Sequence, residues 1–355
     1  MAIRAKDIAE MLGVSTAAVS LVVNGRPGVG EKTRQEILEK IRELGCEYLL
    51  KENVLPQKKG TIGFVVYKKS GLIIEESPLF TSILEGIERQ ITAQGYALNF
   101  IYMNASDSAS DALPQTAPLP EAAHTVSYRC EGCDGLLLYG VEMDRADLEP
   151  FLQTGIPFVV LDNAFPGTDV DSVAIDNALG VSQAIRFLAD HGHEHSGYLR
   201  CTERIAGFSE RFAAYEHCMR ELGLPVTPDR ILDVGYSEDE IADAIEDYLY
   251  VRKVPDRPTA FFADNDFIAC HAMLAFRAHG LDCPDDLSLI GFDDRQICRM
   301  VTPQMSAVSI PKSEFGPAAV DLLLSRMGGR AYSVKLRLGT QLIARESVRM
   351  LYPFA

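Results

Sequence analysis

Three short helices are predicted by residues 6–45, KDIAEMLGVSTAAVSLVVNGRPGVGEKTRQEILEKIRELG. Apolar residues recur at helical spacing before Gly13, and this glycine then permits the sharp change of direction that ends the first helix. Ser15 can cap a second helix over residues 16–23 by accepting a backbone N–H bond. A third, amphipathic helix is expected over residues 31–44. Two short helices joined at a steep angle around a glycine are typical of a helix-turn-helix that reads DNA.

A series of short motifs strengthens this interpretation, because a plain helical hairpin needs the glycine and the apolar stripe but not these motifs. They are Asp7-Ile8-Ala9, Val14-Ser15, Val19-Ser20, Asn24-Gly25, Lys32-Thr33-Arg34 and Glu43-Leu44-Gly45. With this series at this spacing, the segment resembles the headpiece of the lactose-repressor (LacI/GalR) family. The resemblance implies that the N-terminal region binds double-stranded DNA.

The net charge of −16 is unusual for a DNA-binding chain until it is divided along the sequence. Residues 1–60 hold ten Lys and Arg against eight Asp and Glu, whereas the remainder holds 24 against 42. A slightly basic headpiece on an acidic body is compatible with phosphate contact at one end only. No charged-then-apolar leader precedes the headpiece, and no run approaches the ~20 apolar residues that span a bilayer. We therefore expect a cytoplasmic protein without membrane contact.

Cysteine and histidine residues do not form a convincing metal motif. The eight cysteines are scattered, and a cytosolic chain keeps them reduced. The pair Cys130 and Cys133 has no second pair at zinc spacing. His193, within the HGHEH stretch at residues 191–195, is expected to pack in a turn. No metal and no cofactor are predicted.

After residue 60, short apolar runs alternate with amphipathic helices. Strands are expected at residues 61–67, 97–103, 135–141, 158–162, 172–175, 196–200, 230–234, 260–263, 287–292 and 307–310, and helices at residues 80–94, 146–153, 178–190, 210–222, 238–249, 266–278 and 314–327. This alternation predicts parallel sheets covered by helices on both faces, which bind ligands beyond the carboxyl ends of their strands. Residues 104–127 lack periodicity and predict a long surface loop with at most a helical turn.

The order of these elements also resembles the core of the lactose-repressor family, and through it the type I periplasmic sugar-binding fold. The matching stretches are Thr61-Ile62-Gly63, Asp134-Gly135, Gly155-Ile156-Pro157, Val173 to Asp176-Asn177, Gly192-His193, Ser209 to Tyr215, Ala263-Asp264-Asn265-Asp266, Leu289-Ile290-Gly291-Phe292-Asp293-Asp294 and Arg345-Glu346-Ser347. The resemblance implies an all-α headpiece followed by an α/β core of two parallel-sheet subdomains, with an effector between them.

The implied domains are a headpiece over residues 1–46, a hinge over 47–60 and a core over 61–355. Within that core, one subdomain spans about residues 61–161 plus 294–327, and the other about 162–293 plus 328–355. The three crossovers between them are expected near Asp162, Asp293 and Gly328.

Four polar residues lie just past predicted strands or at helix starts, and the resemblance places effector contacts at them: Asp162, Arg211, Asn265 and Asp293. Carboxylates that accept from hydroxyl groups and an arginine that donates a fork suit a polyhydroxylated ligand, most simply a sugar. The alternative is that Asp162 and the neighbouring Asp and Asn residues cap the turns or helices that follow. Arg211 and Asp293 can also hold each other when the cleft is empty.

Two aromatic residues are further candidates for the effector site. Tyr236 aligns with a family position that offers a ring face to the ligand, although a packing tyrosine fits the sequence equally well. Phe80 lies where the first helix of the core meets the cleft, and its alternative is a core residue at a helix start.

The second headpiece helix presents Thr16, Ala17, Ser20 and Leu21 on its groove-facing side. In the family, the positions of Thr16, Ala17 and Leu21 read base edges. Because these side chains are small or apolar, they suit thymine methyl groups rather than bidentate bonds to guanine or adenine. Phosphate-positioning roles are expected for Ser15, Asn24, Thr33 and Arg34.

Two departures from the family pattern concern the ends of the headpiece. Arg4 occupies the position of the usual Thr or Ser cap of the first helix. The family hinge contains a leucine that wedges into the minor groove, and Leu55 occupies that position. However, Tyr48, Leu49 and Glu52 replace its usual proline, asparagine and alanine, which puts the wedging in doubt.

The sequence therefore predicts a ligand-responsive, sequence-specific transcriptional regulator, a repressor of carbohydrate-utilisation genes. A homodimer would bind a pseudo-palindromic operator, because two-fold proteins read two-fold sites. The alternative is a solute-binding module without a gene-regulatory role. An enzyme is not expected, because no Walker loop, GxGxxG after a strand or GxSxG elbow occurs.

Overall fold

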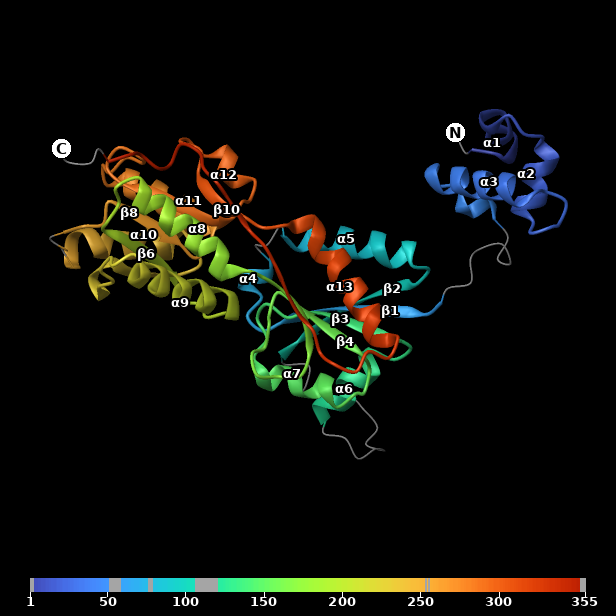
Figure 1. The fold of residues 1–355 in the computed structure, drawn as a ribbon, viewed down its shortest axis with the longest axis horizontal. Helices are drawn as coiled ribbons and strands as arrows, with labels where there is room; N and C mark the ends of the chain where they lie inside the picture. Colours follow the sequence, from blue (N-terminus) through green and yellow to red (C-terminus); the bar gives the residue numbers. More distant parts are fainter. Residues whose placement is uncertain are drawn as a thin grey trace. The chain divides into compact units, whose positions relative to one another are not determined.

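The computed structural model describes residues 3–50, 59–75, 79–105, 121–252, 254 and 256–351. The chain divides into an N-terminal unit and a core unit that begins at Thr61 (Figure 1). None of the helices in these ranges combines the length and hydropathy that a bilayer crossing requires.

The N-terminal unit is the predicted three-helix headpiece. Its elements are α1 (Ala5–Leu12), α2 (Thr16–Val23), α3 (Glu31–Glu43) and a short 3₁₀ helix, η1 (Glu47–Leu49). Gly13 ends α1 with a left-handed φ of 65°, and the Ser15 hydroxyl accepts from the Ala18 backbone N–H at 3.0 Å. Fully buried Ile8, Val19 and Ile37 join the three helices in one apolar core. The predicted turn, cap and core are thus confirmed.

The headpiece extends past residue 46, where the sequence placed its end. Leu49 and Leu50 pack against the headpiece core, and the Tyr48 hydroxyl donates to the Ile3 carbonyl at 2.8 Å. Apolar and aromatic residues thus tie the first part of the expected hinge to the helices. At the other end, Arg4 makes no side-chain capping bond, and the Asp7 carboxylate accepts from its backbone N–H at 2.8 Å instead. The expected minor-groove residue, Leu55, lies outside the described residues.

The first sheet of the core has six strands in the order β11-β5-β4-β3-β1-β2. Its strands are β1 (Thr61–Lys68), β2 (Ala97–Asn104), β3 (Gly135–Tyr139), β4 (Phe158–Leu161), β5 (Asp171–Ile175) and β11 (Lys335–Leu338). The pairings from β11 through β1 are parallel. Helices α5 (Leu79–Ala93) and α13 (Lys312–Met327) cover one face, and α6 (Glu121–Arg129) and α7 (Arg145–Leu152) cover the other (Figure 1).

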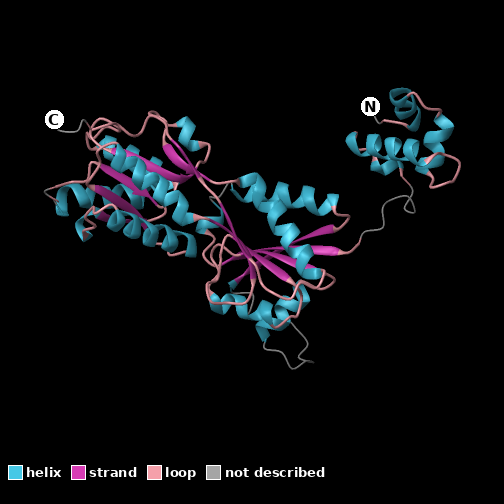
Figure 2. Cartoon of the chain, in the orientation of Figure 1, coloured by secondary structure: helices cyan, strands magenta, loops and turns pink. Residues whose placement is uncertain are grey.

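The second sheet has six strands in the order β12-β10-β9-β8-β6-β7. Its strands are β6 (Ser196–Cys201), β7 (Ile231–Val234), β8 (Ala260–Ala263), β9 (Ser288–Asp293), β10 (Ser306–Ser309) and β12 (Gln341–Ile343). All pairings are parallel except that of β12 with β10. Helix α8 (Asn177–Asp190) packs on α9 (Ala206–Glu221), and α10 (Glu238–Glu246) packs on α11 (Asp266–Ala278) (Figure 2). The predicted α/β class with two parallel-sheet subdomains is confirmed.

The first crossover between the sheets follows β5 rather than Asp162, where it was expected. β5 pairs in parallel with β4, so the chain turns after Asp162 and returns to the first sheet for one more strand. Positive φ angles of 61° at Asp162 and 44° at Phe165 accompany this turn. The first crossover comes only after β5 because all five residues of this strand are buried in the first sheet.

The second and third crossovers also lie further along the chain than residues 293 and 328, where they were expected. β10 pairs with β9 and β12, so the chain leaves the second sheet only after Ser309. α13 then packs on α5, and β11 adds to the first sheet beside β5. The third crossover lies between Leu338 and Gln341, because β11 provides an edge strand that the sequence analysis did not include.

Several short elements were not predicted. These are α4 (Leu72–Glu75), α6, η3 (Pro228–Arg230), α12 (Ile297–Met300), β11 and β12. The helix expected over residues 238–249 ends as α10 and continues as a π-helix, η4 (Asp247–Arg252). Within the expected loop over residues 104–127, residues 106–120 lie outside the described ranges, and α6 begins at Glu121.

Candidate functional site

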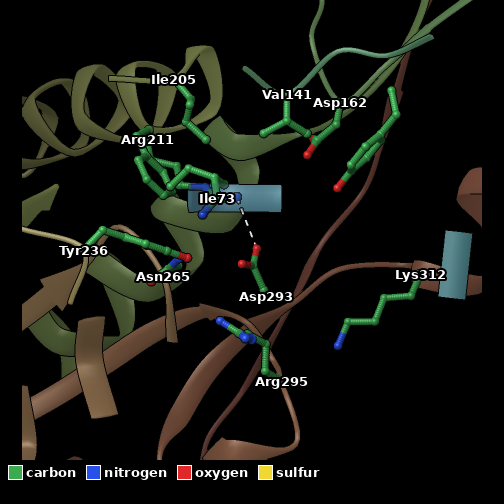
Figure 3. A pocket seen from close by; sticks show the side chains of 12 residues that line it. Ile73, Val141, Asp162, Ile205, Arg211, Tyr236, Asn265, Asp293, Arg295 and Lys312 are labelled. Carbon is green, nitrogen blue, oxygen red and sulfur yellow. Dashed lines mark hydrogen bonds and ion pairs between the residues drawn. The ribbon is translucent and has the colours of Figure 1, made fainter. Parts of the chain in front are cut away.

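A cavity lies where residues from both subdomains of the core meet (Figure 3). It is lined by Ile73, Tyr139, Val141, Asp162, Ile205, Phe208, Arg211, Tyr236, Asn265, Asp293, Arg295 and Lys312. Its empty volume is about 490 Å³, part of which is open to solvent. Its apolar walls and few convergent polar groups are the features of a small-molecule site.

Five of the six predicted effector residues line this cavity, and the topology explains why they meet. Asp162 follows β4, Asp293 ends β9, and Asn265 lies between β8 and α11. Because these strands are parallel, their carboxyl ends share one edge of each sheet. The sixth residue, Phe80, is not among the lining residues. Its ring packs in an aromatic cluster with Phe64, Phe100 and Tyr139.

Arg211 is held in place by three different partners. Its Nε donates to the Asn177 side-chain oxygen at 2.9 Å, and its Nη1 donates to the Asp264 carbonyl at 2.5 Å. Its Nη2 forms an ion pair with the Asp293 carboxylate at 3.2 Å (Figure 3). The guanidinium carbon lies 3.7 Å from the centre of the Phe292 ring. Arg211 and Asp293 thus form the mutual ion pair that the sequence suggested.

Asn265 and Tyr236 form a second polar group on the cavity wall. The Asn265 side-chain oxygen caps α11 by accepting from the Ile268 backbone N–H at 3.1 Å. Its amide nitrogen donates to the Tyr236 hydroxyl at 2.9 Å. Tyr236 is 7 % exposed, and burial raises its pKa to about 12, so the phenol is neutral at pH 7. Asn265 therefore both caps a helix and orients the tyrosine, so the capping alternative and the site assignment are compatible.

Asp162 has an unusual protonation behaviour for a cavity carboxylate. Burial raises the pKa of Asp162 to about 7, because the lowering effect of Arg211 is smaller and the charge of Asp293 adds to the rise. Near neutral pH, this carboxyl group can therefore donate or accept a hydrogen bond.

Two neighbouring carboxylates are already hydrogen-bonded within the protein. Asp264 accepts from the Tyr198 hydroxyl at 2.5 Å and from the Cys201 backbone N–H at 2.7 Å. Asp294 accepts from Arg345 at 2.6 Å and from Arg299 at 3.2 Å. These two carboxylates stabilise the turns behind the cavity.

Sequence reasoning missed two cations of the cavity, Arg295 and Lys312. Arg295 follows the Asp293-Asp294 pair, and its backbone N–H donates to Asp266 at 2.6 Å. Lys312 is the first residue of α13, and its Nζ donates to the Asp294 carbonyl at 2.7 Å. Arg295 could have been proposed from the sequence, because it follows the predicted site residue Asp293 by two positions.

A chain of hydrogen bonds connects the cavity with the crossovers. Asn177, which binds Arg211, donates through its amide to Glu210 at 2.8 Å. Glu210 in turn accepts from both Nη atoms of Arg337, at 2.7 and 2.8 Å. Because Arg337 belongs to β11 and Glu210 to α9, this ion pair joins the two subdomains.

The expected DNA-contacting residues lie on α2 and α3 of the N-terminal unit. Ser15, Thr16, Ala17 and Ser20 are exposed, whereas Leu21, Asn24, Thr33 and Arg34 are half-buried. Asn24 donates to the Ser20 carbonyl at 2.7 Å, and Arg34 donates to the Arg26 carbonyl at 2.6 Å. The start of α2 thus offers an exposed surface of small side chains.

The HGHEH stretch forms a turn after α8, as expected. His193 is fully buried, with Nδ1 2.9 Å from the Thr259 hydroxyl and Nε2 2.9 Å from the Arg349 carbonyl. Burial lowers the pKa of His193, so it is neutral at pH 7. The described residues contain no group of three or more His, Cys, Asp or Glu side chains suited to a metal ion.

Two protein-family models match the chain. The model for bacterial regulatory proteins of the lacI family matches residues 5–47, and the model for a periplasmic binding protein-like domain matches residues 185–348. Among curated proteins, the HTH-type transcriptional repressor PurR of Photobacterium profundum is 27% identical over 98% of each chain. The ribose operon repressor of Haemophilus influenzae is 28% identical, also over 98% of each chain.

Solved structures share the fold of the chain. The complex of the transcriptional regulator CelR with cellobiose has a TM-score of 0.69 at 24% identity, covering 97% of this chain and 99% of that one. The lac repressor dimer bound to operator and the anti-inducer ONPF has a TM-score of 0.69 at 20% identity, covering 98% of this chain and all of that one.

Proposed function

Because the chain belongs to the lacI family of bacterial regulatory proteins, we propose that it is a DNA-binding transcriptional repressor controlled by a small effector. The observation that carries this proposal is the presence of two sites in one chain. The exposed start of α2 offers a surface for DNA, and the cavity around Arg211 offers a site for a ligand. A solute-binding module without a regulatory role would not need the headpiece.

The effector that suits the cavity is a small polyhydroxylated molecule. Asp162, Asp293 and Asn265 supply acceptors and a donor for hydroxyl groups, and Arg211 supplies a fixed fork. Tyr139, Val141, Ile73 and Phe208 supply an apolar wall for the C–H face of a sugar ring. A solved relative of similar fold is in complex with cellobiose, which supports this class of ligand. The genes controlled would then serve carbohydrate utilisation.

Effector binding would act on DNA through the arrangement of the two subdomains. A ligand that contacts both subdomains favours one arrangement of them over another only if it binds the two arrangements with different affinities. We place the protein in the bacterial cytoplasm as a homodimer on a pseudo-palindromic operator, because a two-fold protein reads a two-fold site. Thr16, Ala17 and Leu21 would contact base edges, with a preference for thymine methyl groups. Ser15, Asn24, Thr33 and Arg34 would contact phosphates.

The first test is to incubate the full-length protein with sheared DNA of its source organism and to sequence what it retains. A small set of sites that share an inverted repeat is the expected result. Uniform retention that disappears at moderate salt would indicate electrostatic contact only and would contradict the proposed function.

The second test concerns the ligand site. Arg211→Ala should abolish the effector-dependent change in operator affinity, because it removes a group that contacts Asn177, Asp264 and Asp293 together. Operator affinity without effector should stay within about threefold of wild type, since Arg211 lies in the core. Arg200→Ala is the matched control, because Arg200 pairs with Asp233 at 2.5 Å and does not line the cavity. An effector response retained in Arg211→Ala would contradict the assigned site.

A further inference from the structure

We propose that the second subdomain contains a ligand site of its own, a cavity beside Tyr248 and Arg257 that binds a small carboxylic acid with an apolar body. We call it the second cavity, to distinguish it from the effector cavity around Arg211. Its empty volume is about 640 Å³, part of which is open to solvent. The inference goes beyond the proposed function, because it depends on neither the headpiece nor the effector cavity.

The second cavity lies at the opposite end of the second sheet from the effector cavity. It is lined by residues that precede β8 and β9, among them Arg257 and Asp286. Asn265, which lines the effector cavity, instead follows β8 and caps the start of α11. Phe276, near the other end of α11, lines the second cavity. The 13 residues of α11 span about 20 Å, so the two cavities are separate sites.

The walls of the second cavity are largely apolar. They include the side chains of Leu249, Phe261, Phe276, Leu281 and Leu287. The rings of Phe261 and Phe276 are stacked, with their centres 5.7 Å apart. Apolar walls of this kind favour a ligand that buries an apolar body against them.

Tyr248 provides a hydrogen-bond donor that has no acceptor. Its side chain is 1 % exposed, and its ring meets Phe261 edge-on with the ring centres 6.1 Å apart. Within the described ranges, its buried hydroxyl has no hydrogen-bond partner. A buried phenol normally has one, because an unpaired polar group in the interior is costly. Burial raises the pKa of Tyr248 to about 12, so the hydroxyl keeps its proton at pH 7 and can donate to a ligand.

Positive charge is concentrated near this phenol. Arg257 lines the second cavity, and the guanidinium carbon of Arg252 lies 5.4 Å from the centre of the Tyr248 ring. These two arginines and Arg230 lower the pKa of the phenol, whereas the Asp229 carboxylate opposes them. Arg230 is buried, and its Nε and Nη1 also have no hydrogen-bond partner among the described residues. Unpaired donors beside cationic groups favour an anionic ligand.

The lining also contains one carboxylate, Asp286, which is bonded to its own loop. It accepts from the Asp282 backbone N–H at 2.7 Å. Asp286 and Arg257 are both exposed, and no ion pair joins them in the described part of the chain. The Arg257 fork therefore remains available for two parallel hydrogen bonds, the arrangement in which a guanidinium group binds a carboxylate.

The backbone that carries Tyr248 and Arg252 is unusual. Both belong to η4, a π-helix of six residues. Such segments are rare in proteins and occur frequently at functional sites. The location of η4 on the wall of the second cavity is therefore consistent with a binding role.

Calorimetric titration of the full-length protein at fixed ionic strength tests the site. The probes are phenylacetate and hexanoate, each compared with its neutral amide, and inorganic phosphate as a bare anion. At least one of the two acids should bind with a Kd of about 1 mM or tighter, and about tenfold more tightly than its amide. The proposal is overturned if neither acid binds, if acid and amide bind equally, or if inorganic phosphate binds as tightly as the acids.

Two variants locate the acid. Arg257→Gln should weaken its binding about tenfold, and Tyr248→Phe about fivefold, because each removes a donor to the carboxylate. Arg220→Gln is the control, since Arg220 is exposed on α9 and does not line the second cavity. An unchanged affinity in both Arg257→Gln and Tyr248→Phe would show that the acid binds elsewhere.

The melting temperature of the ligand-free protein provides a second readout. Because the Tyr248 hydroxyl has no partner, Tyr248→Phe should leave the melting temperature unchanged or raise it. Tyr215→Phe is the matched control, because this buried hydroxyl donates to the Ser196 carbonyl at 2.8 Å, and its loss should lower the melting temperature. An equal fall in both variants would show that the Tyr248 hydroxyl is already satisfied and would contradict its role as a donor to a ligand.

Discussion

Asp162 shows how one residue can connect backbone geometry with ligand chemistry. The turn after β4 gives it a φ of 61°, which a non-glycine residue adopts only at a cost. The same turn places its carboxyl group in the cavity near Arg211 and Asp293. Burial disfavours the charged form, so the residue holds its proton up to a pH of about 7.

The raised pKa of Asp162 predicts a pH-dependent cost in stability. Because the pKa is higher in the folded than in the unfolded chain, the stabilising contribution is complete below about pH 4 and is lost as the pH rises through 7. Asp162→Asn should therefore raise the free energy of unfolding of the ligand-free protein by about 2 kcal/mol at pH 8, and by much less at pH 5.

Urea denaturation at the two pH values checks this prediction. Asp169→Asn, at an exposed position of the same loop, serves as the control. A gain that is equal at pH 5 and pH 8 would show that the raised pKa is not its cause.

At the scale of the elements, the contact of α5 with α13 depends on two glycines, Gly86 and Gly316, which allow the helices to approach closely. A Cβ on Gly316 would lie 2.5 Å from the Ile87 nitrogen, 2.7 Å from the Gly86 carbonyl carbon and 2.9 Å from the Ile83 oxygen. All three are backbone atoms, which cannot rotate away as a side chain can. The helix that carries Lys312 is therefore fixed to the first subdomain at this point.

Gly316→Ala should force the two helices apart. We expect the free energy of unfolding to fall by about 2 kcal/mol, the usual cost of overpacking a close contact. Gly339→Ala is the control, because its Cβ would meet Leu179 at an ordinary 3.8 Å. Thermal unfolding of both variants tests this, and equal melting temperatures would contradict the close-contact argument.

At the scale of the whole core, three crossovers and the Arg337–Glu210 ion pair connect the subdomains. Burial raises the pKa of Glu210, but hydrogen bonds from Arg337 and Asn177 outweigh this effect, so the pKa is lowered overall. The ion pair therefore stabilises the folded core above the ordinary pKa of a glutamate and is lost as the pH falls through the lowered value. Through Asn177, the same carboxylate is connected to Arg211 in the cavity.

Glu210→Gln should lower the free energy of unfolding by about 1 kcal/mol at pH 7, with a smaller difference near pH 4. Glu221→Gln on the same helix is the matched control, because it loses an exposed pair with Arg186. Urea denaturation at both pH values compares the variants. An equal loss in the two variants would show that the link between the subdomains is no stronger than a surface pair.

The sequence was sufficient to predict the elements with a clear hydrophobic pattern. β8 and α11 have the predicted bounds, because one is a short apolar run and the other is amphipathic with an Asn cap. β11 was missed, since KLRL alternates charged and apolar residues and has partly exposed positions at the edge of the first sheet. The crossovers were misplaced because strand pairing, which decides them, is not visible in local patterns.

The cavity residues also divide into those that the sequence could predict and those that it could not. Asp162, Arg211, Asn265 and Asp293 follow strands or lie in recognisable motifs, so their convergence could be predicted. Lys312 carries no such signal, because its position in the cavity depends on the second crossover, which brings the start of α13 there. Similarly, Tyr48 lies in a segment expected to be a hinge, and its bond to Ile3 became visible only in three dimensions.

The late position of β11 and β12 has a consequence for synthesis on the ribosome. The first sheet lacks its β11 edge until Leu338 has emerged, and the second lacks its β12 edge until Ile343 has followed. Both nascent subdomains must therefore wait, with one strand edge open, until the last two strands of the core have been translated. A ribosome that stalls before codon 335 would release two unfinished sheets, each able to pair with a neighbouring nascent chain.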